Sequence, residues 1–133
     1  MTIAKQVWPD RTAQVGIKRY VGRFTAPASA NGAVLAKTAG GRGITSIVSG
    51  VAGSGIYTAT FDEVGEAWLG CRLDVLNVGA GYTTHKTANV TAYSNTAKTL
   101  TFEVTNYNGT SAIDFANGDQ LLFECEWADS DRP

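Results

Sequence analysis

The segment Thr99–Thr105, with the sequence TLTFEVT, alternates strictly between polar and apolar side chains. The segment Gln120–Trp127, with the sequence QLLFECEW, alternates almost as regularly, and every second side chain from Leu121 onward is apolar. Successive side chains of a β-strand point to opposite faces of its sheet, so each segment predicts a strand with one apolar face. Two such faces predict half of the core of a β-sandwich, which strands from the rest of the chain would cover.

Further strand signals are segments rich in β-branched or aromatic residues, at 17–25, 44–49, 56–61, 71–78 and 87–94. In the last of these, alternation predicts that Val90 and Ala92 point inward and that Tyr93 points outward. Residues 62–70 start with acidic side chains and end at a glycine, which favours one short helical turn. Residues 112–115 are expected to add a short edge strand. The pattern predicts an all-β, single-domain β-sandwich, jelly-roll-like, of seven to eight short antiparallel strands.

A chain of 133 residues is expected to form one domain with a sizeable core. We expect an extended N-terminal arm at 1–16, the sandwich at 17–127 and a frayed tail at 128–133. Residues 26–43 are rich in alanine and glycine, and Val34 and Leu35 are their only large apolar side chains. A long loop of this kind is usually functional or mobile, so it is expected to contact a partner or to order on assembly.

The formal net charge of −1 is unevenly distributed. Residues 1–42 contain seven bases and one acid, a balance of +6, whereas residues 43–133 contain four bases and eleven acids, a balance of −7. This asymmetry fits an arm that docks on a partner of opposite sign, and equally a basic segment that folds back on its own acidic body. Nucleic acid is not an expected partner, because the bases are dispersed and the whole chain is mildly acidic.

No apolar run approaches the roughly 18 residues of a membrane-spanning helix, so no membrane contact is expected. The first ten residues lack the apolar region of a secretory signal, which favours folding in a reducing cytosol. Cys71 and Cys125 are therefore expected to be buried thiols rather than a disulfide. Both lie on the apolar side of their predicted strands, so they could be neighbours in the core.

The sequence offers no constellation that predicts catalysis, a metal site or a cofactor. His85 is the only histidine, and neither cysteine is spaced from it as zinc ligands are. The glycine-rich segment Gly40–Gly43 lacks the lysine and the following helix of a phosphate-binding loop. The large aromatic residues favour a core or an oligomer interface over an exposed sugar-binding platform; they include Tyr57, Trp68, Tyr93 and Trp127.

The order of these segments resembles that of small structural proteins of tailed bacteriophages, in particular head decoration (cement) proteins with a jelly-roll-like β fold. The segments that support the resemblance are Arg19–Phe24, Gly53–Phe61, Leu69–Cys71 and Asn117–Phe123. The likeness spans roughly residues 17–127. It rests on the order and general character of the segments rather than on a single motif. It implies a protein that assembles in the host cytoplasm as a dimer or trimer on the outside of the capsid, where it bridges neighbouring major capsid proteins.

We therefore expect a virion structural protein that is not an enzyme and has no cofactor. Aromatic and arginine side chains dominate protein interfaces, and the residues expected at the partner interface are Trp8, Arg11, Lys18, Arg19, Arg23, Val34 and Leu35. The alternative is a carbohydrate- or receptor-binding β-sandwich module of a phage tail, which predicts an exposed aromatic platform. A weaker alternative is a small hydrolase, which predicts a pocket that brings His85 together with an acid.

Overall fold

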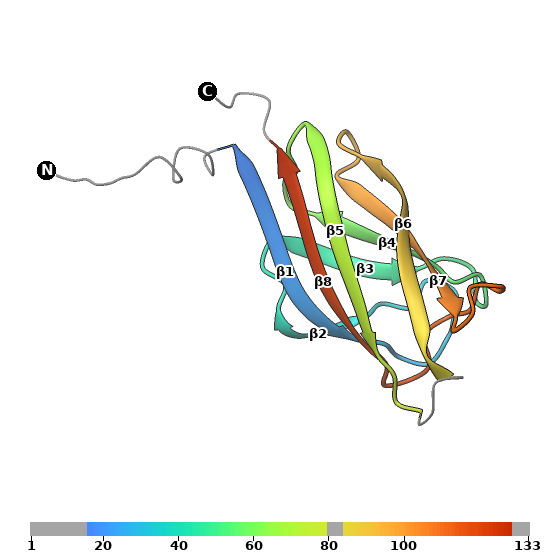
Figure 1. Ribbon diagram of the computed structural model, residues 1–133. Helices are drawn as coiled ribbons and strands as arrows, with labels where there is room; N and C mark the ends of the chain where they lie inside the picture. The colour runs from blue at the N-terminus through green and yellow to red at the C-terminus, as the bar shows by residue number, and fades with distance from the viewer. Residues whose placement is uncertain (1–15, 80–83, 129–133) are drawn as a thin grey trace, which may run out of the picture.

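Two antiparallel sheets make up the computed structural model, which describes residues 16–79 and 84–128 (Figure 1). Within those residues the strands are β1 (Ile17–Thr25), β2 (Ala36–Gly40), β3 (Ile44–Ser49), β4 (Ile56–Phe61), β5 (Ala67–Leu76), β6 (Lys86–Ser94), β7 (Thr99–Asn106) and β8 (Gln120–Ala128). The predicted all-β sandwich of short antiparallel strands is confirmed. Among the described residues, no helix has the length and apolar character needed to cross a membrane.

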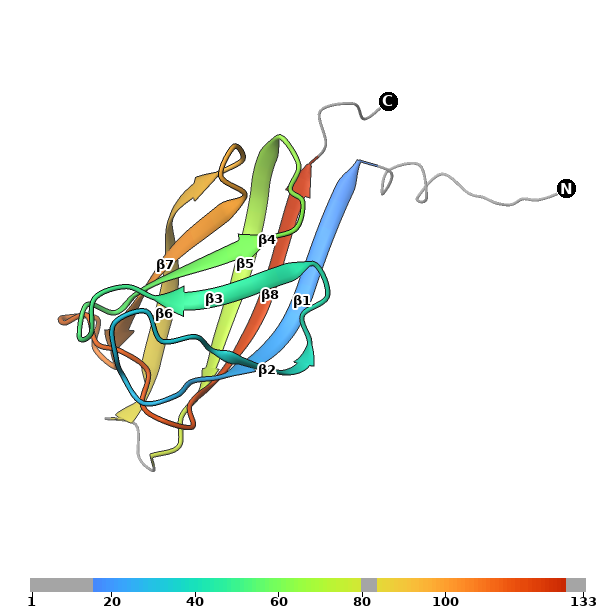
Figure 2. The same ribbon diagram turned by 180° about the vertical axis from the view of Figure 1, so that it is seen from behind.

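The first sheet has the strand order β2-β1-β8-β5, and the second has the order β3-β4-β7-β6. Hairpins join β1 to β2, β3 to β4 and β6 to β7, while every other connection crosses from one sheet to the other. In the first sheet, β8 pairs with β1 on one side and with β5 on the other. Figure 1 views the outside of the first sheet, and Figure 2 views the molecule from behind, with β3, β4 and β7 in front.

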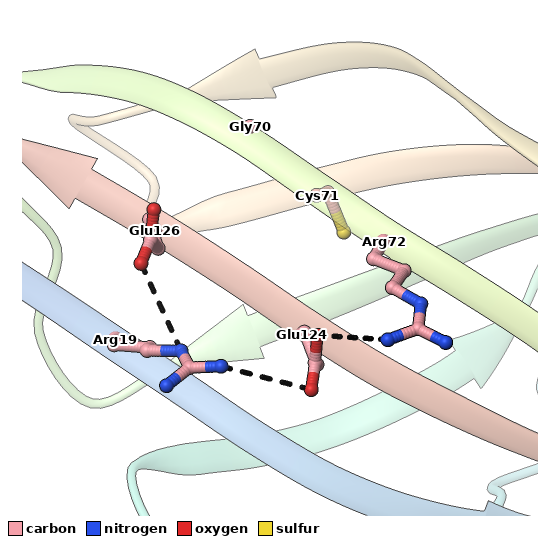
Figure 3. Close-up of a pocket in the computed structure, with 6 residues that line it drawn as sticks. All are labelled: Arg19, Gly70, Cys71, Arg72, Glu124 and Glu126. Atoms are coloured by element: carbon pink, nitrogen blue, oxygen red, sulfur yellow. Dashed lines mark ion pairs between the residues drawn. The ribbon is translucent and has the colours of Figure 1, made fainter.

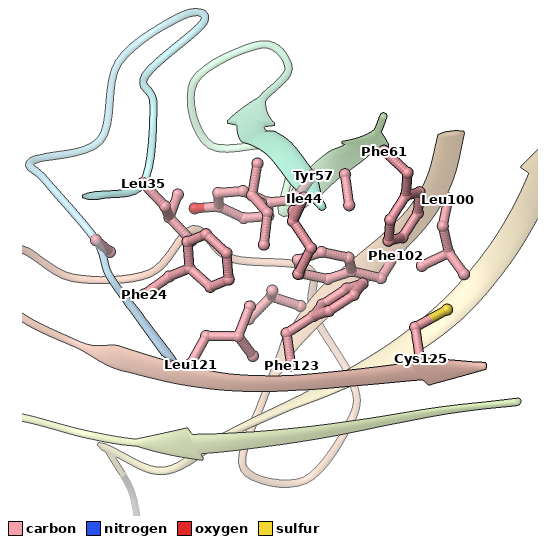
Figure 4. Packing of buried hydrophobic residues seen from close by; sticks show 14 of the residues in the cluster. Phe24, Leu35, Ile44, Tyr57, Phe61, Leu100, Phe102, Leu121, Phe123 and Cys125 are labelled. Carbon is pink, nitrogen blue, oxygen red and sulfur yellow. The ribbon is translucent and has the colours of Figure 1, made fainter. Parts of the chain in front are cut away.

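The core lies between the two sheets and is dominated by aromatic rings (Figure 4). The two segments with the clearest alternation, β7 and β8, lie in opposite sheets, and their rings meet at Phe102 and Phe123 with centroids 6.3 Å apart. Trp127 has no exposed surface and contacts Phe61 edge to face at 5.9 Å. Burial of each such side chain stabilises the fold by roughly 1.5–3 kcal/mol, so the inner faces of β7 and β8 organise the sandwich.

The helical turn predicted at residues 62–70 is wrong, because β5 begins at Ala67. Trp68 pairs across the sheet with Trp127, and Leu69 is an extra residue in a bulge before Gly70. Burial of Trp68 against the core and pairing with β8 outweigh the weak local preference of the acidic residues for a helical turn.

Residues 26–43 are more ordered than the sequence predicts. They contain β2, and Val34 forms an isolated bridge with Val48 of the second sheet. Leu35 is only 4% exposed and belongs to the core. The glycine-rich segment Gly40–Gly43 is the turn from β2 into β3, with positive φ at all three of its glycines. Its glycines serve the backbone of a tight turn rather than a phosphate.

The inward and outward positions predicted for the end of β6 are also wrong. The register pairs Val90 with Phe102 but Ala92 with Thr101, so Thr91 is an extra residue in a bulge. The bulge reverses the alternation, leaves Ala92 exposed and turns the Tyr93 ring toward Trp127, 5.6 Å between centroids. The edge strand predicted at 112–115 is reduced to one bridge.

Candidate functional site

The outer face of the first sheet is built from alternate residues of β1, β8 and β5. The register aligns Arg19 with Glu126 and Gly70, and aligns Val21 with Glu124 and Arg72. We call this surface the outer face; it comprises Arg19, Val21, Arg23, Gly70, Arg72, Asp74, Leu76, Leu122, Glu124 and Glu126. Strand alternation is what brings these side chains together, because their partners at the intervening positions point into the core.

A row of ion pairs crosses this surface from β1 to β5 (Figure 3). Arg19 lies 3.7 Å from both Glu124 and Glu126. Arg72 lies 3.8 Å from Glu124 and 2.6 Å from Asp74. Such exposed pairs contribute at most about 1 kcal/mol each to folding. Their main effect is to hold charges of both signs in fixed positions on a broad sheet surface.

Apolar side chains lie beside the charged row. Val21 is 38% exposed and Leu76 is 66% exposed. Leu122 lines two shallow hollows, one of about 260 Å³ with Leu76 and Arg23, and one of about 170 Å³ with Val21 and Ala39 of β2. Protein interfaces combine an apolar centre with a polar rim that fixes orientation. The outer face therefore has the composition of a surface that docks on another protein.

The outside of the second sheet has a different character. Its side chains are mostly small and uncharged. Among the described outward positions of β3, β4, β6 and β7, Glu103 is the one charged residue. Threonines supply much of this surface, namely Thr58, Thr60, Thr87, Thr91, Thr99, Thr101 and Thr105. Fixed charges of both signs and exposed leucine and valine occur together on the first sheet, which makes its outer face the better candidate site.

The residues expected at a partner interface fall into different places. Arg19 and Arg23 lie on the outer face, whereas Trp8 and Arg11 lie outside the described residues. Lys18 is on the opposite side of β1 and pairs with Glu63 at 3.4 Å. Two further expected residues, Val34 and Leu35, adjoin the second sheet: Val34 is 56% exposed and Leu35 is buried in the core. The side chain of Leu35 is therefore not available to a partner in the folded chain.

Several residues of the outer face were not predicted as site residues from the sequence. The alternation of β8 does place Glu124 and Glu126 on one polar side, but solvated carboxylates are the ordinary expectation there. Only the register reveals that Arg19 of β1 and Arg72 of β5 flank them. The register depends on which strands become neighbours, and that information is not local to any of the three segments.

The hydrolase alternative required a pocket that joins His85 to an acid. A hollow of about 540 Å³ is lined by Val75, Leu76, Asn77, His85, Lys86, Thr87 and Tyr107. An acid adjoining this hollow is Asp119, whose side chain is buried and forms an ion pair with Lys86 Nζ at 3.0 Å. Its carboxylate also accepts hydrogen bonds from the backbone N–H groups of Val78 at 3.0 Å and Ala116 at 2.8 Å. These contacts give Asp119 a structural role. In residues 16–79 and 84–128, no group of three or more His, Cys, Asp or Glu side chains is arranged to hold a metal ion.

The aromatic platform required by the carbohydrate-binding alternative is not formed by the residues proposed for it. Tyr57 is 3% exposed and Trp127 is fully buried, so both are core residues, as the sequence favours. Trp68 is half-buried and packs against Tyr93 with ring centroids 5.8 Å apart and ring planes tilted by 37°. Tyr93 is 49% exposed and the other three side chains are buried or half-buried, so the four do not present a shared flat surface.

Asp114 ties together three loops at one end of the sandwich. Its carboxylate accepts hydrogen bonds from the Ser29 hydroxyl, from Gly53 N at 2.7 Å and from Gly55 N at 2.8 Å. Burial raises the pKa of Asp114, but these three hydrogen bonds lower it by more, so the pKa lies below its ordinary value. The ionised carboxylate therefore holds the loop after β1 against the turn between β3 and β4.

Acid is expected to release these loops. The folded pKa of Asp114 is below the unfolded value of about 3.9, so its contribution to stability is present above about pH 4 and is lost as the pH falls toward the folded pKa. In NMR spectra recorded from about pH 6 to about pH 2, the amide resonances of Gly53 and Gly55 should titrate together with a midpoint below about 3.9. The common titration should vanish in Asp114→Asn; a midpoint above that value would contradict the assignment.

No protein-family model, curated protein or solved structure matches this chain.

Proposed function

We propose that this chain is a structural protein of a tailed-bacteriophage virion that decorates and cements the icosahedral capsid. In this proposal it has no enzymatic activity and bridges neighbouring copies of the major capsid protein from outside the shell. The observation that supports it best is the outer face of the first sheet, where exposed Val21 and Leu76 lie beside a fixed row of ion pairs. The order of the sequence segments, which resembles that of head decoration proteins, supports it independently.

The size of the outer face indicates how such a protein would bind. Three strands spaced about 4.8 Å apart, and nine residues of β1 at about 3.3 Å each, give a surface on the order of 400 Å². A stable interface buries about 800 Å² on each partner, so a single outer face would bind weakly. Two or three linked copies on a repeating shell would gain affinity by multivalency without new contacts. We therefore propose a homo-dimer or homo-trimer, assembled in the host cytoplasm and placed on the capsid exterior.

The basic segment 1–42 supplies a second contact in this proposal. Its balance of +6 favours a partner surface with acidic residues. Within it, Arg19 and Arg23 lie on the outer face, and residues 1–15 lie outside the described part of the chain.

The proposed function is tested by mixing the purified chain with empty heads of the bacteriophage that encodes it and pelleting the heads. The chain should pellet with heads that lack it, up to a fixed number of copies, and heads that already carry their full set should take up none. Light scattering after size-exclusion chromatography should give a dimer or trimer. A monomer that stays in the supernatant at every concentration would overturn the proposal.

The alternative, a carbohydrate- or receptor-binding module of a phage tail, is less well supported. It depends on exposed aromatic rings, and Tyr57 and Trp127 lie in the core. Binding of the purified chain to immobilised glycans, together with no binding to heads, would favour it.

A further inference from the structure

Cys71 of β5 and Cys125 of β8 are direct partners across the first sheet. Both side chains point toward the core, and both thiols are free. Directly opposite residues of an antiparallel pair have Cα atoms about 4.5 or 5.5 Å apart, according to the kind of pair. Both values lie within the 4.4–6.8 Å range found for disulfides. The backbone therefore already has the spacing that a disulfide needs.

The surroundings of Cys125 favour a negative charge on its sulfur. The thiol of Cys71 donates a hydrogen bond to Cys125, which lowers the pKa of Cys125 although burial raises it. The indole N–H groups of Trp68 and Trp127 also lower this pKa, and neither has a full hydrogen-bond partner of its own. The pKa of Cys71 is raised, first because its thiol is the donor and second because it is buried.

Cys71 is the less buried member of this pair. Cys71 is only partly buried, and it lines a hollow of about 300 Å³ together with Gly70, Arg72 and Glu126 (Figure 3). Gly70 has no side chain, and the position a Cβ atom would take there is open space. Cys125 lies behind Cys71 with 1% of its surface exposed. The partly buried Cys71 is therefore the thiol that a small reagent reaches first.

We propose that Cys71 and Cys125 form an oxidisable dithiol that a small peroxide converts into a disulfide between β5 and β8. The Cys71 thiol first passes its proton to the Cys125 sulfur, and the resulting Cys71 thiolate attacks one peroxide oxygen. The O–O bond breaks, which gives a sulfenic acid on Cys71 and a hydroxide that takes a proton from solvent and leaves as water. The Cys125 sulfur then attacks the Cys71 sulfur; the S–O bond breaks, the S–S bond forms and a second water leaves with the Cys125 proton. The two thiols lose two electrons in total, and hydrogen peroxide is reduced to two waters.

The disulfide would join two strands that are already neighbours but are separated by roughly 50 residues of chain, so it constrains the unfolded chain more than the native fold. For a loop of that size the expected rise in Tm is on the order of 10 °C. Reduction should reverse it. The modification would therefore be a redox-dependent crosslink between β5 and β8 of the first sheet.

The test uses the full chain, treated with hydrogen peroxide and compared with a reduced sample. We expect the number of titratable thiols under denaturing conditions to fall from two to zero, the intact mass to fall by two hydrogens, and Tm to rise and then return after reduction. The control Cys71→Ser should show no rise in Tm. A treated wild-type chain that keeps both thiols, gains oxygen instead of losing hydrogen, or forms only disulfide-linked dimers would overturn the proposal without reference to any variant.

Discussion

Replacing Asp119 with alanine is expected to lower the free energy of unfolding by about 3–5 kcal/mol. Asp119 is 1% exposed and pairs with Lys86, whose side chain is only 9% exposed. Its carboxylate also accepts backbone N–H groups of Val78 and Ala116. Removal of the carboxylate would leave a buried ammonium group without its counter-charge and two backbone donors without partners, and each such group costs free energy.

Urea denaturation followed by tryptophan fluorescence measures this loss. A matched control is Asp74→Ala, which removes a carboxylate of the same size whose partner Arg72 is 63% exposed. That control should change the free energy of unfolding by no more than about 1 kcal/mol. Equal losses of unfolding free energy in the two variants would contradict a stabilising role for the buried pair of Asp119 and Lys86.

The substitution Leu122→Asp is expected to weaken binding to empty phage heads by about 30-fold or more. Leu122 lies at the centre of the apolar part of the outer face, between Arg23 of β1 and Asp74 of β5. Loss of an interface hot spot costs at least about 2 kcal/mol, which corresponds to roughly that change in affinity.

The matched control for this variant is Thr101→Asp. Thr101 occupies an outward position on β7, a central strand of the second sheet, just as Leu122 does on β8 of the first. Affinity measured by co-sedimentation should be unchanged in the control, and thermal melts should show that both variants fold. A larger loss of affinity for Thr101→Asp would move the docking surface to the second sheet.

Much of the sandwich could be predicted from the sequence because its strands follow the simplest pattern. The predicted bounds of β1, β3 and β4 match the structure, and β7 and β8 each turn the apolar face that their alternation predicts toward the core. These two strands lie in opposite sheets, however, and do not form one half of the core together. The failures occur where contacts distant in sequence decide the conformation. Trp68 extends β5 by pairing with Trp127, and the bulge at Thr91 reverses the end of β6.

Only part of the candidate site could be predicted from the sequence. Arg19 and Arg23 could be placed on one side of a strand by alternation alone. Their assembly with Glu124 and Arg72 required the strand order β1-β8-β5, which no local pattern contains. Leu35 was misplaced because its neighbours are small, and a lone leucine in such a segment looks the same whether it anchors the core or a partner.

The proposed contact between this chain and a capsid is tested most directly by a cryo-electron microscopy reconstruction of heads saturated with it. We expect density for the sandwich at repeated positions across junctions between capsid subunits, with Arg19, Leu122 and Arg72 of the outer face toward the shell and the threonine-rich face of the second sheet toward solvent. Ordered density with the second sheet against the shell, or saturated samples with no added density, would contradict it.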